Sequence, residues 1–300
     1  MLPRRGAWNV TRGMSWVFTG LAVGFLAFMV ALFIAQSLPV WRKEGLDFIG
    51  GVKWFYRNAV FGALPMIYGT VVTSVLALLL AAPVGIGAAL FTAEVLPARG
   101  RLAVKIVIEL LAGVPSVVSG LLGILFLRDW VYRALTSFDP LSGDTLLTAG
   151  LLLAVMVLPT VMTLADDALR GVPAAQRHAA RGLGLNRAEV ACLVVLPPAA
   201  PGIFAALLLA LGRALGETIA VFLVVGRQDN QWPVSVFSLR PLIEAGQTLT
   251  SKLGGSETNI AYGDPLHWGA MIGLGLLLLA MVGVVTWLGG WLAERRAHRA

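Results

Sequence analysis

The chain has 300 residues, of which 58% are hydrophobic and a further 34 are glycine, while only 13% are charged. Soluble domains carry about 25% charged residues, so this composition excludes a soluble enzyme with a polar surface. It also excludes a disordered chain, and a single cysteine, Cys192, excludes a disulfide scaffold. We therefore predict an all-α integral membrane protein.

Six apolar stretches are long enough to cross a bilayer, which takes about 20 helical residues each. In chain order they are residues 15–36, 58–93, 106–127, 145–165, 199–226 and 265–293. The third contains Glu109, and the fifth contains Arg213 and Glu217. The basic start and the first stretch resemble a signal peptide, but the apolar run is too long for one, so we expect a retained anchor.

The loops between these stretches predict the orientation. The segments before the first stretch, after the second, between the fourth and fifth, and after the last are rich in arginine. The positive-inside rule therefore places both termini in the cytoplasm. Residues 37–57, 128–144 and 227–264 become the outer loops. The net charge of +7 fits anionic lipid headgroups, and we expect no nucleic-acid partner.

The chain carries no motif of catalysis or nucleotide binding. HExxH, CxxC, GxSxG and the P-loop pattern are all absent from the sequence. The histidines His178, His267 and His298 are scattered, so no metal site is expected. We predict a chain that is not an enzyme and holds no cofactor. If ATP drives it, ATP and Mg are bound by a partner ATPase.

A cytoplasmic loop at about residues 173–197 has a pattern of its own. Pro173 is suited to the first turn of a short alanine-rich helix. Gly184 permits a sharp turn, and a second helix is predicted from Arg187 until Pro197 and Pro198 end it. Two short helices at an angle would form a knob below the membrane.

This loop resembles the coupling loop of ABC importer permeases, whose pattern is E-A-A-x3-G-x9-I-x-L-P. The matching residues are His178, Ala179, Ala180, Gly184, Val194, Leu196 and Pro197. His178 replaces the glutamate of the family, which removes any salt bridge that this glutamate makes to the ATPase. Val194 replaces isoleucine, and every spacing is kept. The resemblance implies that the knob docks on a partner ATPase.

Three further segments resemble the phosphate-specific ABC transporter permeases. They are residues 81–94, 109–120 and 211–226, the last containing the Arg-Ala-x-Gly-Glu-Thr pattern. The continuation after Glu217 and Thr218 is more similar to the PstC type than to the PstA type. The resemblance implies a type I ABC importer permease fold with six transmembrane helices, N-in and C-in.

The same resemblance implies a domain organisation. Residues 1–65 would hold an N-terminal tail, the first transmembrane helix and an outer loop. Residues 66–292 would form the permease domain, and residues 293–300 a cytoplasmic tail.

The resemblance also implies a function, an ATP-driven importer of inorganic phosphate in the cytoplasmic (inner) membrane. The implied partners are a homologous PstA-like permease subunit, two PstB-like ATP-binding subunits, a PstS-like extracytoplasmic phosphate-binding protein and the lipid bilayer. Two alternatives stay open. One is a permease for molybdate, sulfate or another oxyanion, and the other is a proton-coupled carrier that uses Glu109 and Glu217. A role in phosphate sensing also stays open.

The charges within the apolar stretches are the candidate pathway or gating residues, because a charge in a spanning helix costs about 2.5–3.5 kcal/mol on insertion scales. They are Arg213, Glu217 and Glu109. Arg213 and Glu217 are four residues apart, so on one helix they would share a face and form an ion pair. The guanidinium of Arg213 also suits phosphate oxygens. The alternative role of the pair is a structural lock between helices.

Two neighbouring features refine these candidates. Gly212 and Gly216 form a GxxxG step that would let another helix approach closely. Glu109 lies near Pro115, so its alternative role is to pair across helices or to satisfy backbone groups freed by the proline.

Overall fold

The computed structural model describes residues 5–233 and 239–297, and the side chains of residues 11–233 and 239–291. Within these ranges five helices are long and apolar enough to cross a membrane. They are α1 (Arg5–Glu44), α3 (Leu64–Glu94), α7 (Leu146–Arg170), the helix that ends in α10 (Leu196–Gly216), and α14 (Pro265–Ala297). A bent helix pair gives a sixth span if it is counted as one. The predicted helical membrane fold is confirmed.

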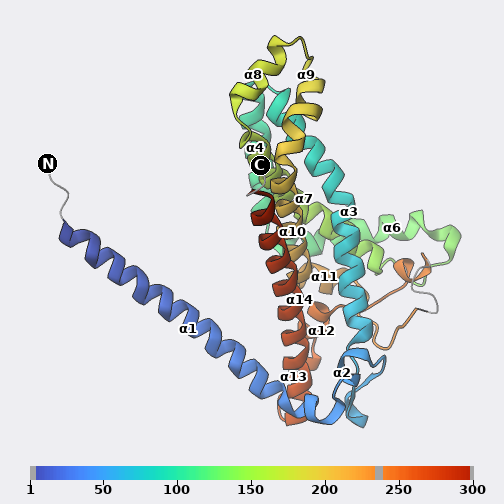
Figure 1. Ribbon diagram of the computed structural model, residues 1–300. Coiled ribbons are helices and arrows are strands. Elements are labelled where there is room, and N and C mark those ends of the chain that lie inside the picture. Colours follow the sequence, from blue (N-terminus) through green and yellow to red (C-terminus); the bar gives the residue numbers. More distant parts are fainter. Residues whose placement is uncertain (1–4, 234–238, 298–300) are drawn as a thin grey trace.

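Helices α3 and α7 form the centre of the bundle (Figure 1). A Cβ atom at Gly85 of α3 would lie 2.8 Å from Val161, and one at Gly150 of α7 would lie 2.6 Å from Leu76. Lipid tails are as apolar as leucine, so helices in a membrane associate by close backbone packing at small residues. Helix α10 packs against both α7 and α14.

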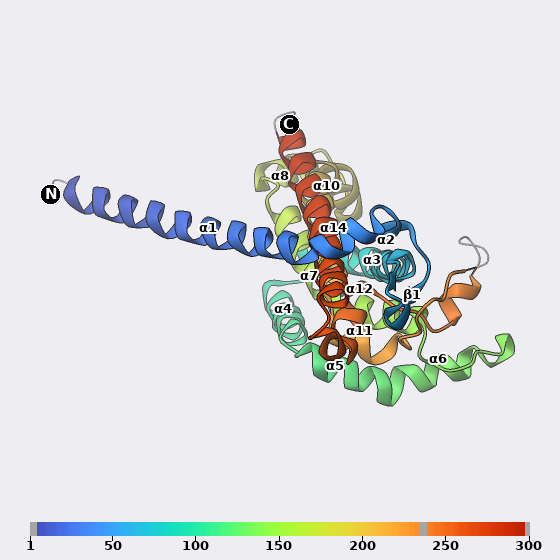
Figure 2. The same cartoon turned by 90° about the horizontal axis from the view of Figure 1, so that it is seen from below.

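Helix α1 leaves the bundle at an angle, as Figures 1 and 2 both show. Its C-terminal part contacts the bundle: Gln36 and Pro39 lie against Gly269 of α14, and Val40 lies against Gly273. The first predicted span lies inside α1, but the helix continues to Glu44, so the start of the predicted outer loop 37–57 is helical. The Arg5 end of α1 and the Ala297 end of α14 both point away from the layer described next.

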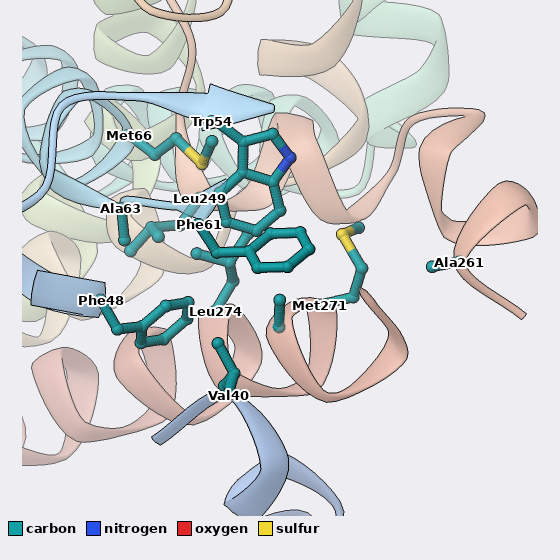
Figure 3. Close-up of a cluster of buried hydrophobic side chains, with 11 residues drawn as sticks. Val40, Phe48, Trp54, Phe61, Ala63, Met66, Leu249, Ala261, Met271 and Leu274 are labelled. Atoms are coloured by element: carbon teal, nitrogen blue, oxygen red, sulfur yellow. The ribbon is translucent and has the colours of Figure 1, made fainter. Parts of the chain in front are cut away.

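Residues 45–63, 226–233 and 239–264 cover the end of the bundle that is expected to face outward, and we call them the outer layer. The elements are α2 (Asp47–Gly50), β1 (Trp54–Phe55), η1 (Tyr56–Asn58), β2 (Val60–Phe61), η5 (Arg240–Ile243), α12 (Leu249–Leu253) and α13 (Glu257–Ala261). Strands β1 and β2 are antiparallel, with Trp54 opposite Phe61. Figure 3 shows their side chains meeting Phe48, Leu249 and Met271 in one buried cluster.

The second predicted span, 58–93, begins too early. Residues 58–63 belong to the hairpin, and α3 starts at Leu64 with Pro65 in its first turn. Proline is favoured there because its missing N–H has no partner in a helix start.

The third predicted span, 106–127, is wrong as a single straight helix. The chain forms α4 (Ala98–Ala112), breaks at Gly113–Pro115, and resumes as α5 (Ser116–Leu122), η2 (Gly123–Leu127) and α6 (Arg128–Ala134), followed by η3 (Thr136–Phe138). The two halves are bent by 88°. The cause is Pro115, which has no N–H to continue the helix and disfavours helical geometry at Val114. Helix α6 consequently runs sideways from the bundle (Figure 1).

The fifth predicted span, 199–226, differs at both ends. The helix does not stop at Pro197 and Pro198, because α9 (Arg187–Glu189) continues through the π-helical segment η4 (Val190–Val195) directly into α10. A local π turn re-satisfies the backbone groups that prolines leave free. The same helix then ends at Gly216, and α11 (Ile219–Val224) follows after a break. A continuous helix through Glu217 was therefore a wrong prediction.

Candidate transport pathway and coupling site

Two broken helices meet beside the centre of the bundle. Helices α5 and α11 each begin directly after a break, and they pack against each other. A Cβ atom at Gly120 of α5 would lie 2.6 Å from Leu223 and 3.1 Å from Ala220 of α11. Irregular backbone at membrane depth is tolerated where protein buries it or where it lines a cavity, and discontinuous helices mark binding sites in many transporters. The breaks are therefore the first candidate site.

Arg213 lies on α10 in the last turn before the break, and its side chain is exposed. Its Nη1 donates a hydrogen bond to Thr160 Oγ1 of α7 at 3.3 Å. Glu217 lies just beyond the helix end, in extended backbone geometry, and its Oε1 accepts a hydrogen bond from Ala220 N–H at 3.4 Å.

The predicted ion pair between Arg213 and Glu217 is wrong. Among the residues whose side chains are described, the two form no salt bridge with each other: Arg213 bonds to Thr160, and Glu217 bonds to the N–H of Ala220. An i,i+4 pair needs a continuous helix between its members, and the chain leaves the helix at Gly216. Among the described side chains Arg213 therefore has no carboxylate partner, and it bonds across to α7.

The two glycines of the GxxxG step differ in how closely other residues approach them. A Cβ atom at Gly212 would lie 3.6 Å from Thr286 Oγ1 of α14, whereas one at Gly216 would meet nothing within 4 Å. Of these two glycines, only Gly212 borders another helix among the described residues, and the space beside Gly216 is open there.

Glu109 lies on α4 and is exposed. Its side chain approaches Lys105 of the same helix at 4.0 Å, and its backbone carbonyl accepts from Gly113 N–H at 3.1 Å. The structure does not bring it to Arg213 or Glu217 by any contact among the described side chains. Its pathway role stays a prediction.

The predicted knob is confirmed as a pair of helices around a glycine. Helix α8 (Ala174–Gly182) is followed by Gly184 with φ of +88°, a conformation that only glycine adopts without strain. Asn186 and Glu189 then form a capping box at the start of α9. Figure 1 shows this knob at the end of the bundle opposite the outer layer.

The residues that match the coupling pattern are spread over this knob. His178 and Ala179 are exposed on α8, and Ala180 is buried beneath them. Leu196 is half-buried and Pro197 is exposed at the start of α10. Their role in docking an ATPase stays a prediction.

An ion pair that the sequence did not reveal fixes the knob to the bundle. Arg177 of α8 donates from Nε to Glu94 Oε1 at 2.9 Å, and Glu94 is buried at the end of α3. The other guanidinium nitrogens donate to the carbonyls of Val172 and Leu169, each at 2.6 Å. These carbonyls lie at the end of α7, where a cation is favoured by the helix dipole. One side chain thus joins α3, α7 and α8.

The outer layer holds a second charged cluster that the sequence did not reveal. Lys252 Nζ is buried and binds Asp229 Oδ2 at 2.6 Å and also Glu257 Oε2. Glu257 Oε1 accepts from Trp54 Nε1 at 2.5 Å and contacts His267 Nε2 at 2.9 Å. Burial raises the pKa of the Glu257 carboxyl, but the hydrogen bonds from Lys252 and Trp54 lower it by more, so its pKa lies below the ordinary value.

Across the residues that the structure describes, no group of three or more His, Cys, Asp or Glu side chains could hold a metal ion. The charged clusters therefore consist of ion pairs and hydrogen bonds, with arginine and lysine as the groups able to attract an anion.

The chain combines apolar spans, paired helix breaks beside an exposed intramembrane arginine, and a basic knob at one end. This combination defines a membrane component of a transport system. The chain belongs to the family described as "Binding-protein-dependent transport system inner membrane component", whose profile matches residues 81–298. Members of this family are components of ABC transport systems, which implies a partner ATPase and a binding protein. The chain is thus a multi-pass membrane permease component and not itself an enzyme.

Two relatives carry more specific names. The phosphate transport system permease protein PstC 1 of Mycobacterium tuberculosis is 36% identical over 258 residues, which cover 75% of this chain and 76% of the relative. The phosphate transport system permease protein PstC of Mesorhizobium japonicum is 34% identical over 282 residues, which cover 89% of this chain and 83% of the relative.

Two solved structures share the fold. One is a bacterial ABC transporter involved in the import of the acidic polysaccharide alginate, with a TM-score of 0.62 and 16% identity over 97% of this chain and 99% of that one. The other is the MetNI methionine ABC transporter, with a TM-score of 0.57 and 17% identity over 77% and 94%. The predicted type I ABC importer permease fold is confirmed.

Proposed function

We propose that this chain is the permease subunit of an ATP-driven importer of inorganic phosphate in the cytoplasmic (inner) membrane. The observation that carries the proposal is the identity of 34–36% to two PstC permeases over most of each chain. The exposed Arg213 beside the helix breaks supports it, because a guanidinium attracts an oxyanion and matches its oxygens geometrically.

The partners follow the same reasoning. A PstA-like permease completes the pathway, and a PstS-like protein delivers phosphate to the outer layer. Two PstB-like subunits bind ATP and Mg and dock on the knob. Both chain termini then lie in the cytoplasm.

Coupling runs from the knob to the pathway. Closure of the ATPases displaces α8, and Arg177 passes this displacement to α3 through Glu94 and to the end of α7. Helix α7 carries Thr160, the partner of Arg213. ATP binding thereby shifts the population from an inward-facing to an outward-facing pathway.

Competition for uptake tests the substrate. The complete system, with partners encoded beside it, is reconstituted in proteoliposomes that contain ATP, and uptake of radiolabelled phosphate is measured against unlabelled phosphate, molybdate and sulfate. We expect only unlabelled phosphate to compete at comparable concentration. Stronger competition by molybdate or sulfate would assign the chain to another oxyanion.

A further inference from the structure

A polar cavity lies in the outer layer, next to the break that follows α10. Its volume is about 250 Å³, several times the roughly 30 Å³ that a water molecule occupies in the liquid. Phe222 and Gly226 at the end of α11 form one wall, and α12 and α13 form the other. A Cβ atom at Gly254 would lie 3.2 Å from the methyl group of Thr218, so the end of α12 reaches the break itself. The cavity is therefore lined by the helix that follows the break and by the helix whose end reaches the break.

Two cationic side chains line this cavity, and they differ in burial and in their contacts within the protein. Lys252 is buried and tied to Asp229 and Glu257. Arg227 is exposed, and its guanidinium carbon lies 4.5 Å from the centre of the Phe222 ring. Its charge also acts on the carboxyl of Asp144, but among the described residues the guanidinium donates no hydrogen bond, so its N–H groups can reach a ligand in the cavity.

The loop that carries Arg227 is held in a strained conformation. Gly226, Arg227 and Asn230 have φ of +87°, +53° and +60°. Such backbone costs about 1–3 kcal/mol at a non-glycine residue and persists only where the surroundings impose it. Two hydrogen bonds hold this loop in place. Asn230 Oδ1 accepts from Trp54 N–H at 2.5 Å, and Gln228 N–H donates to the carbonyl of Gly246 at 3.1 Å. The fold thus fixes Arg227 at the cavity.

We propose that this outer cavity is a transit site for a tetrahedral oxyanion, held by Arg227 before the anion reaches Arg213. The substrate class rests on the proposed function. Ser256 also lines the cavity and adds a neutral hydroxyl donor, whereas the donors of Ser251 and Gln247 are engaged within the protein. Asp229 and Glu257 balance the two cations, which keeps binding weak enough for release, as conduction requires.

The test uses the complete reconstituted system and radiolabelled inorganic phosphate as the probe. Arg227→Gln removes the exposed cation, Arg227→Lys keeps the charge without the planar fork, and Arg240→Gln is the control. Arg240 is an exposed arginine of the same layer that pairs with Glu244 away from this cavity. Uptake and ATP hydrolysis stimulated by the loaded binding protein are both measured for equal amounts of folded complex.

We expect Arg227→Gln to lower uptake about tenfold or more, because one charge-assisted hydrogen-bonding group is lost, with stimulated ATP hydrolysis retained. Arg227→Lys should recover part of the uptake, and Arg240→Gln should match the unchanged system. Unchanged uptake in Arg227→Gln would overturn the inference. Loss of stimulated hydrolysis would also overturn it, by assigning Arg227 to docking of the binding protein. Failure of the unchanged system to import phosphate would instead reject the proposed function.

Discussion

Arg213 lies on α10 within hydrogen-bonding distance of Thr160, with no carboxylate partner among the described side chains. Because its charge is exposed at a helix break, we expect Arg213→Gln to lower phosphate uptake about tenfold or more without loss of folded protein. Arg213→Lys should retain part of the activity, since the charge remains while the planar fork is lost. Uptake of radiolabelled phosphate, scaled to folded protein, measures the effect.

The matched control is Arg133→Gln on α6, an exposed arginine away from the break. Exchanging the charges of Arg213 and Glu217 should not restore transport, because the two side chains do not pair. Full uptake by Arg213→Gln would refute the pathway role and leave a structural role.

Arg177 and Glu94 form a buried ion pair at the base of the knob. Removal of one member of a buried pair leaves an unpaired charge, so Arg177→Gln should lower the free energy of unfolding by about 3 kcal/mol. Arg181 approaches the same carboxylate at 3.9 Å and is far more exposed, so Arg181→Gln should cost about 0–1 kcal/mol. Denaturant unfolding of the detergent-solubilised protein provides the comparison. Equal losses in the two variants would show that Arg177 does not fix the knob.

Glu257 makes stability depend on pH in a defined direction. Its pKa lies below the ordinary value of 4.5, so its ionised form stabilises the folded state above that pH, and this stabilisation is lost as the pH falls through the lowered pKa. Glu257→Gln should therefore be less stable near neutral pH, and the difference from the unchanged protein should shrink on acidification below pH 4.5. Thermal unfolding across a pH series measures it, with the exposed Glu244→Gln as control. A difference that stays constant with pH would contradict this assignment.

At the scale of elements, the turn in the knob depends on one conformation. Gly184 has φ of +88° with open space around it, so a larger residue is opposed by backbone strain and not by crowding. Gly184→Val should keep membrane insertion and ATP hydrolysis but reduce transport per ATP. Gly182→Val is the matched control, because Gly182 also has open space but no positive φ. Normal uptake by Gly184→Val with confirmed expression would contradict the coupling role.

Local sequence signals predicted some breaks and not others. Pro115 lies in the third stretch, and its lack of an N–H was visible, but composition alone did not reveal that the bend reaches 88°. Pro197 and Pro198 predicted a helix end, yet the π-helical segment before them absorbs the disruption. The end of α10 at Gly216 has no proline, and the assumption of a continuous helix produced the wrong ion pair.

At the scale of the whole molecule, pairs of residues far apart in the chain limit what the sequence can predict. Trp54 and Glu257 are 203 residues apart and Arg177 and Glu94 are 83 apart, so no local pattern connects them. The apolar spans, the knob and its glycine were predictable because each rests on composition or spacing within one segment. The charged clusters depend on how segments meet, which hydropathy does not encode.

The knob, the helix breaks and the outer layer follow one another along the bundle (Figure 1). The knob holds the Arg177–Glu94 pair, and the outer layer holds the cavity lined by Arg227 and Lys252. This arrangement fits a pathway that a partner ATPase opens from one end and a binding protein supplies from the other. A proton-coupled carrier would need no knob and no ATPase.

ATP-driven import is tested most directly by measuring phosphate uptake in the complete reconstituted system while the energy source is varied. We predict that uptake requires ATP on the side of the knob, stops when the ATPase subunits are omitted, and survives collapse of the proton gradient by an uncoupler. Uptake that persists without the ATPase subunits and stops on addition of the uncoupler would contradict it.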